Sequence, residues 1–306
     1  MAILTADRGF RSVAAVAAGG IAALVIAIGV LLVGGGVDGF RAAGPAFFWT
    51  EGWDPVRGEF GALAPLLGTI VSALLALLIA VPVALGVAVF LTELAPAWLA
   101  GPAGLAVELM AAIPSIIYGM WGLFVLAPVM ADHVQPLLAD WLGFLPLFQG
   151  PPIGIGMLTA GLVLGLMVVP YMAAIARDLF SMVPPQLKEA AIGVGATKWE
   201  VVRAVVLPHT RLGLVGAVIL GLGRALGETM AVTFVIGNSH RIDASLFAAS
   251  GTIASTLANE FTEAKDDLHM ASLWALAAVL FLLTFVILAL GRLLVGRLTV
   301  APGSRP

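Results

Sequence analysis

The chain has 306 residues, of which 61% are hydrophobic and only 11% are charged. A soluble domain of this length does not reach such a composition, so the sequence predicts an integral membrane protein. The formal net charge of −3 gives no reason to expect a nucleic-acid partner, and the absence of cysteine excludes disulfides and thiolate metal sites.

Apolar runs of about 20 to 25 residues recur along the chain, which is the length that a helix needs to cross roughly 30 Å of hydrocarbon. They predict an all-α fold with six transmembrane helices. The first run follows two arginines but is longer than the apolar stretch of a typical signal peptide, so we interpret it as a retained helix. The predicted spans are Ser12 to Val33, Pro65 to Thr92, Gly104 to Met130, Ile153 to Ala176, Leu212 to Gly237 and Ala271 to Leu294.

Lysine and arginine residues are distributed unequally between the two sides of these spans. Most lie before the first span, in the loop after the fourth or after the sixth, whereas Arg41, Arg57, Arg241 and Lys265 fall on the opposite side. Because cytoplasmic loops carry the excess of basic residues, both termini are predicted to be cytoplasmic. The same pattern divides the chain into an N-terminal segment with one helix and an outer loop (1–64), a core of five helices (65–294) and a cytoplasmic tail (295–306).

Several motifs of enzymes and metal sites are absent or lack their context. The GxGxxG spacing at residues 34–39 follows a membrane helix rather than a strand, so it predicts an exit turn and not a dinucleotide site. There is no GxxxxGK[ST] loop, so we expect no cofactor in this chain, and ATP and Mg²⁺ would be bound by another subunit. The histidines lack metal-ligand spacing, and we interpret them as solvated or interfacial side chains. They are His133, His209, His240 and His269.

The loop at residues 178–211 is the longest on the predicted cytoplasmic side. Consecutive prolines at 184 and 185 end the incoming helix, the segment QLKEAAI has the length of about two turns, and Gly195 interrupts the chain after that segment. Thr197 and Glu200 form a capping box that begins a second helix. From the residues alone, this is an amphipathic segment beneath the bundle, with its basic side chains toward lipid headgroups.

The same loop resembles the EAA loop of binding-protein-dependent ABC importer permeases. The sequence Glu-Ala-Ala, a later glycine and Leu207-Pro208 stand at the spacing of that pattern, and Val205 replaces its isoleucine. In that family the segment is the coupling helix that docks into a cleft of a cytoplasmic ATPase. Small side chains suit a helix that sits closely in a groove, and glycine permits the sharp turn after it. The ATPase contacts that the resemblance implies are Glu189, Ala190, Ala191 and Gly195.

Three further segments narrow the resemblance to the permease subunits of phosphate-specific ABC importers. The resemblance runs from the first outer loop nearly to the C-terminus, and it implies the type I ABC importer permease fold in a bacterial inner membrane. It also implies a PstA-like second permease as heterodimer partner, two PstB-like ATPase subunits that bind ATP and Mg²⁺, and an external PstS-like phosphate-binding protein. The segments are GRALGETMAVTFVIGN at 223–238, AAIPSIIYGMWGLFVLAP at 111–128 and MVVPYMAAIARDLFSMVP at 167–184.

A basic and an acidic residue lie within the predicted fifth span. An arginine near a helix centre costs about 2.5 to 3.5 kcal/mol on insertion scales, so Arg224 should face the bundle interior and hold a partner. Glu228 is that partner by position, since residues i and i+4 share a helix face. A guanidinium also offers a planar fork of donors that matches phosphate oxygens. We therefore expect the pair to line the substrate pathway, with Glu228 limiting how tightly phosphate binds; the alternative is a permanent salt bridge that fixes helix packing.

Other polar side chains on the predicted spans can line the same pathway. The acidic one either pairs with Arg224 or reaches the membrane interface. The hydroxyls either donate to a passing anion or bond their own backbone or a neighbouring helix. These side chains are Glu108, Ser115, Tyr118, Thr229 and Thr233.

The resemblance predicts the permease subunit of an ATP-driven phosphate importer, which forms half of the pathway by alternating access and does no chemistry itself. Two other functions are consistent with the residues. One is a permease of the same fold for another oxyanion such as sulfate or molybdate, because all such permeases share the EAA loop. The other is a secondary transporter in which Glu228 and Glu108 relay protons, which would need no ATPase.

Overall fold

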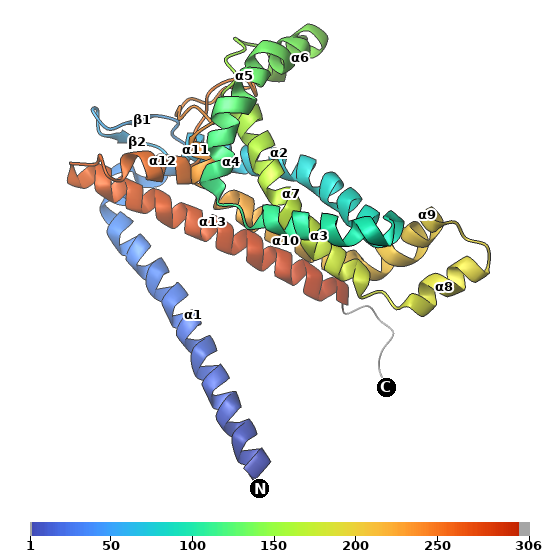
Figure 1. Cartoon of the computed structure of the whole chain (residues 1–306). Helices are drawn as coiled ribbons and strands as arrows, with labels where there is room; N and C mark the ends of the chain where they lie inside the picture. Colours follow the sequence, from blue (N-terminus) through green and yellow to red (C-terminus); the bar gives the residue numbers. More distant parts are fainter. Residues whose placement is uncertain (1, 300–306) are drawn as a thin grey trace.

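The computed structural model describes residues 2–299, which are mostly helical (Figure 1). Within these residues, six helical stretches are long and apolar enough to cross a membrane. The predicted all-α membrane fold is therefore confirmed. The six stretches are Gly9–Phe48, Leu63–Leu94, Ser115–Leu142, Met157–Ser181, Lys198–Leu226 and Asp267–Gly296.

The core of the molecule consists of four helices that lie side by side (Figure 1). They are α2 (Leu63–Val89), α7 (Met157–Ser181), α10 (Leu207–Leu226) and α13 (Asp267–Thr299). The most extensive contact joins α2 and α7, where small residues let the two backbones approach closely. The main buried cluster lies where α2, α7 and α10 meet, and it includes Ala76, Leu164 and Leu226.

The first helix, α1 (Ala2–Ala43), is longer than predicted and packs against α13 near its C-terminal end, while its N-terminal half extends away from the bundle (Figure 1). Glycines form the contact: a Cβ atom added at Gly36 would come within 2.7 Å of the backbone of Ala275. Gly39 is similarly close to the backbone of Ala271 and Ser272. Gly35, Gly36 and Gly39 thus belong to a helix-packing face, and the predicted exit turn was wrong because α1 continues to Ala43.

The predicted third span, Gly104 to Met130, is divided in two by Pro114. Helix α3 (Ala97–Ala111) ends before it, and a new helical stretch begins at Ser115. Proline lacks the N–H that would continue the helix, and it disfavours helical backbone at the residue before it. Figure 1 shows the second stretch rising from the bundle, whereas α3 lies along it. The stretch comprises α4 (Ser115–Trp121), η3 (Gly122–Leu126), α5 (Ala127–Val129), η4 (Met130–Val134) and α6 (Gln135–Leu142).

The predicted fifth span, Leu212 to Gly237, also differs from the structure. The helical stretch begins earlier, with α9 (Lys198–Val201) and η6 (Val202–Val206), which run directly into α10. It ends at Leu226, and the rest of the predicted span contains only the short helix α11 (Met230–Thr233). Residues 227 to 229 therefore form a break inside the segment that the apolar pattern presents as one helix.

The first part of the loop at residues 178–211 folds as predicted, whereas the predicted second helix does not end before Pro208 but continues into α10. Helix α8 (Pro185–Gly193) comes after the two prolines, and Gly195 adopts a φ of +97°, which only glycine adopts readily. The capping box is present at the start of α9: the backbone N–H of Glu200 bonds the Thr197 hydroxyl, and the Glu200 carboxylate accepts from the Thr197 N–H. The loop is therefore one short helix, α8, joined by a sharp turn to the start of the long helical stretch that includes α10.

The opposite end of the bundle carries the small irregular elements (Figure 1). Strand β1 (Trp53–Asp54) pairs antiparallel with β2 (Glu59–Phe60), and α12 (Ile253–Glu260) lies beside them. Trp53 and Phe60 belong to a second buried cluster that joins these elements to α13. The remaining single turns are η1 (Gly44–Phe48) and η5 (Pro146–Phe148), whereas η2 (Phe90–Leu94) continues α2 at the end where α8 lies.

Candidate functional site

Arg224 lies in the last turn of α10, next to two residues of the main buried cluster. Its Nε atom is buried and has no hydrogen-bond partner. Its guanidinium carbon lies 5.2 Å from the centre of the Tyr171 ring, which α7 contributes. A cation within about 6 Å of an aromatic centroid is attracted to the face of the ring. The partner that Arg224 was expected to hold is thus an aromatic ring.

Glu228 does not pair with Arg224, so the predicted ion pair was wrong. The i, i+4 rule requires a continuous helix, and α10 ends at Leu226 before the chain reaches Glu228. The Glu228 carboxylate instead accepts a hydrogen bond of 3.1 Å from the backbone N–H of Ala231 at the start of α11. The Glu228 carboxylate therefore bonds the backbone at the break between α10 and α11.

The guanidinium of Arg224 has donors to offer to a ligand. Among the described residues, no carboxylate forms an ion pair with it, and no other residue accepts a hydrogen bond from it. Arginine stays charged under all ordinary conditions, and a cation in a membrane bundle is costly without a counter-charge. The site is consequently suited to an anion with planar or tetrahedral oxygens.

Glu108 lies on α3 and pairs with Arg177 of α7. Its side chain is 48% exposed, and Arg177 also lies 3.7 Å from Asp178. The alternative in which Glu108 pairs with Arg224 was therefore wrong. The alternative in which Glu108 reaches toward the interface agrees with its exposure.

The predicted hydroxyl groups mostly bond the backbone. Thr233 donates to the carbonyl of Thr229 over 2.7 Å, and Thr229 donates to that of Gly227 over 3.3 Å. Tyr118 donates to the carbonyl of Met110 over 3.0 Å and also lies within electrostatic reach of Arg224. Ser115 is half-buried at the first turn of α4. The side chain that sequence reasoning missed is Tyr171: the chain has only two tyrosines, and the other one, Tyr118, is already near Arg224.

Helix α8 carries the predicted ATPase contacts, and none of its residues is buried. Glu189 and Ala190 are exposed, as is Gly195 in the turn after the helix. Ala191 instead turns inward and packs against the apolar cluster formed by α7, α9 and the end of α2. Three of the four predicted contacts are thus accessible, while the fourth anchors the helix.

The family is established by comparison with known proteins. The family described as "Binding-protein-dependent transport system inner membrane component" matches residues 65–300. The chain belongs to this family. With six helical stretches that can span a bilayer among its described residues, it is a multi-pass protein of the inner membrane.

Curated relatives within the family bear the name phosphate transport system permease protein PstC. The protein from Haemophilus influenzae is 53% identical over 285 residues, covering 92% of this chain and 90% of the relative. The one from Pasteurella multocida is 52% identical over 286 residues, covering 92% and 89%. A probable PstC from Methanocaldococcus jannaschii is 40% identical over 245 residues, covering 79% and 78%.

Solved structures of ABC transporters share the fold. A bacterial transporter involved in the import of the acidic polysaccharide alginate gives a TM-score of 0.57 at 15% identity, covering 83% of this chain and 87% of that one. The MetNI methionine transporter in an inward-facing conformation gives 0.52 at 22% identity, covering 79% and 94%. The predicted fold of an ABC importer permease is confirmed.

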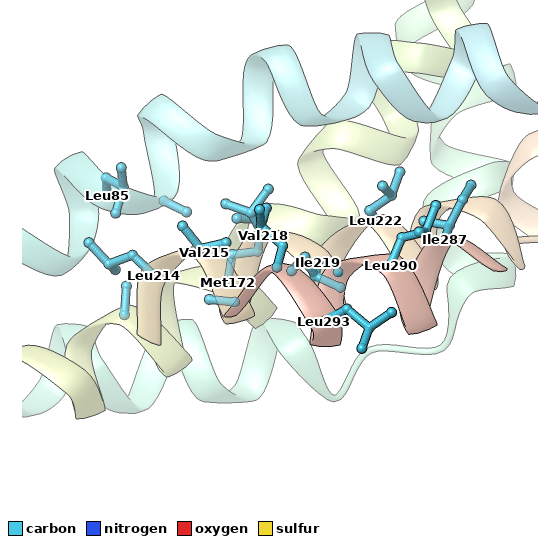
Figure 2. Close-up of a pocket in the computed structure, with 15 residues that line it drawn as sticks. Leu85, Met172, Leu214, Val215, Val218, Ile219, Leu222, Ile287, Leu290 and Leu293 are labelled. Atoms are coloured by element: carbon cyan, nitrogen blue, oxygen red, sulfur yellow. The ribbon is translucent and has the colours of Figure 1, made fainter. Parts of the chain in front are cut away.

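The apolar hollow between the four core helices of this permease is not an anion site. It is a groove of about 760 Å³ between α2, α7, α10 and α13 (Figure 2). Figure 2 shows aliphatic side chains such as Leu85, Val218 and Ile287 turned toward it, together with Met172. No charged or hydroxyl side chain lines it. An oxyanion would lose its hydration there without any compensating donor, so the groove is suited to hydrocarbon.

A polar cluster at the opposite end of the permease from α8 was not predicted. Glu260 at the end of α12 accepts from the indole of Trp53 over 2.6 Å, and the Nε2 atoms of His240 and His269 lie 2.9 and 3.0 Å from its oxygens. Burial by itself raises the pKa of Glu260, but the hydrogen bonds from His240, Trp53 and His269 outweigh it and hold that pKa below its usual value. Of the two expected positions, solvated or interfacial, the solvated one was wrong for these histidines, because each bonds a largely buried carboxylate.

Proposed function

We propose that this chain is the permease subunit of an ATP-driven importer of inorganic phosphate and forms half of its translocation pathway. The observation that carries the proposal is Arg224, a permanent cation on a membrane helix whose guanidinium has no acidic partner among the described residues. The names of the curated relatives support phosphate as the anion.

The chemistry of Arg224 suits a transient contact with phosphate. A guanidinium donates parallel hydrogen bonds to two oxygens at once, and such charge-assisted bonds are stronger than those between neutral groups. Tyr171 lies against the cation through its ring and leaves the guanidinium donors without protein acceptors. Glu228, at the adjacent helix break, bonds the backbone N–H of Ala231 and so leaves Arg224 without an acidic partner.

The coupling to ATP is assigned to partner subunits. Two cytoplasmic PstB-like ATPases would bind ATP and Mg²⁺ and receive α8 through Glu189, Ala190 and Gly195, with both termini of the permease on the same cytoplasmic side. A PstA-like permease would supply the other half of the pathway, and a PstS-like protein would deliver phosphate from outside. The permease itself then has no catalytic residue; it alternates the access of the region around Arg224.

Reconstitution with these partners tests the proposal. Proteoliposomes are loaded with ATP, and uptake of labelled phosphate is measured with the phosphate-loaded binding protein outside and with increasing unlabelled sulfate. The proposal predicts that uptake requires ATP and does not change when sulfate is added in about hundredfold excess over phosphate. Uptake driven by a proton gradient without ATP would assign a secondary transporter, and equal competition by sulfate would assign a general oxyanion permease.

A further inference from the structure

The exposed helix α8 is joined to the membrane bundle by one ion pair. Lys188 of α8 donates from Nζ to Oε1 of Glu93 over 2.5 Å, and Nζ also lies 3.5 Å from the carbonyl oxygen of Phe180. The side chains of Lys188 and Glu93 are only 21% and 12% exposed. Among the described residues, no other ion pair of a lysine or arginine with a carboxylate is as buried as this one.

The ion pair is needed because α8 has little else to hold it. A helix of nine residues is marginal in water on its own, so tertiary contacts must fix it. None of its residues is buried, and its apolar contact with the bundle runs through Ala191. Lys188 and Ala191 stand three positions apart and so share the inward face, while Glu189 and Ala190 face outward. The inward face of α8 thus contacts the bundle, and its outward face is exposed.

Glu93 stands at the membrane end of this link, in the turn η2 that continues α2. The helix α2 packs extensively on α7, and it also contacts α10, whose last turn carries Arg224. The end of α2 and the segment from α7 to α9 share one apolar cluster, which includes Phe180. A displacement of α8 that moves Glu93 therefore also acts on α2. Because α2 contacts α10, the movement reaches the helix that carries Arg224.

We propose that the Lys188–Glu93 ion pair is the positioning contact that passes movement of the ATPase-docked α8 to α2. The inference rests on the proposed function, since it assumes that an ATPase moves α8. Glu189 and Ala190 contact the ATPase on the outward face, and Lys188 holds α2 on the inward face. Breaking the pair separates the ATPase cycle from the movement of the bundle, while the docking face stays intact.

The test measures coupling in the reconstituted importer rather than assembly. The variants are Lys188→Glu, Glu93→Lys and the double exchange of both, with Lys188→Arg as the conservative variant. Lys198→Glu is the matched control, because Lys198 is an exposed lysine of the same loop without an ion pair among the described residues. The readouts are co-purification of the ATPase, and the number of ATP molecules hydrolysed per phosphate imported.

Coupling free energies between two protein sites typically correspond to factors of about 5 to 150, so each single reversal should raise the ATP used per phosphate at least about fivefold. Co-purified ATPase stays at the wild-type level, and the double exchange, Lys188→Arg and Lys198→Glu stay near the wild-type ratio. If a single reversal reduces assembly, the uncharged variant Glu93→Gln must show the same rise. A wild-type ratio in the single variants, or a double exchange as uncoupled as either single, overturns the inference. Loss of phosphate selectivity in the wild type would instead overturn the proposed function.

Discussion

The contact between Arg224 and Tyr171 provides a quantitative test of the pathway site. Replacement of Tyr171 by leucine removes the ring that holds the guanidinium 5.2 Å from its centre. Cation–π contacts contribute about 0.5 to 1 kcal/mol at exposed sites and about 2 kcal/mol when the cation is desolvated. Because Nε of Arg224 is buried, we take about 1 to 2 kcal/mol for this contact.

Without the ring, the Arg224 side chain is no longer held in one position, so it must be ordered each time that it binds phosphate. If the whole contact energy is used at the slowest step, its loss slows uptake by about 5- to 30-fold, because each 1.36 kcal/mol corresponds to a factor of ten. Tyr171→Phe keeps the aromatic face and should stay within about twofold of wild type. Tyr118→Phe is a further control, since that hydroxyl bonds a backbone carbonyl.

The assay is phosphate uptake into proteoliposomes with saturating phosphate-loaded binding protein, so that the affinity of the binding protein does not limit the rate. The amount of assembled complex is measured for each variant and used to normalise uptake. Tyr171→Leu transporting at the wild-type rate would refute the reasoning. Tyr171→Phe transporting as slowly as Tyr171→Leu would also refute it, because the hydroxyl and not the ring would then be the contact.

Three further predictions concern other parts of the chain. The lowered pKa of Glu260 adds stability that is fully present above the unfolded pKa of about 4.3 and is lost as the pH falls through the folded pKa. The melting temperature below pH 4.3 should therefore drop more steeply in wild type than in Glu260→Gln. Gly36→Ala places a methyl group against the α13 backbone and should cost about 1 to 3 kcal/mol in denaturant unfolding, whereas Gly34→Ala, with open space, should be neutral. Glu189→Lys reverses the charge of the exposed docking face and should abolish co-purification of the ATPase without lowering the amount of folded permease; unchanged co-purification would contradict the docking assignment.

The parts that were predictable from the sequence depend on local rules. A bilayer demands apolar stretches of a fixed length, so the number of spans could be predicted from composition along the chain. The loop around α8 could be described in the same way, because prolines, a glycine at positive φ and a capping box act within a few residues. In each of these cases the residues that determine the local structure lie within or next to the segment that adopts it.

Two of the errors arose where a helix ends inside an apolar run. Hydropathy does not distinguish Gly104 to Met130 from one helix, and Pro114, which divides it, could equally have produced only a kink. At residues 227 to 229 a glycine and the bond from Ala231 to Glu228 end α10, although apolar residues continue. This break removed the premise of the predicted ion pair.

The contacts that sequence reasoning missed join residues far apart in the chain. The Tyr171 ring of α7 contacts Arg224 of α10. Glu260 is hydrogen-bonded to Trp53, His240 and His269, which lie in separate segments of the chain. A single sequence contains the residue types but not the packing that brings them together. The rarity of tyrosine in this chain is the one signal that pointed to Tyr171.

The most direct test of the account is phosphate uptake by the Arg224→Gln variant in the reconstituted importer. A hydrogen bond to a charged group contributes about 1.5 to 3 kcal/mol, so the variant should import phosphate about 10- to 150-fold more slowly at equal complex content. Arg211→Gln, which removes an exposed arginine at the other end of α10, should import at nearly the wild-type rate. Uptake by Arg224→Gln at the wild-type rate would contradict the claim that Arg224 contacts phosphate on its way through the membrane.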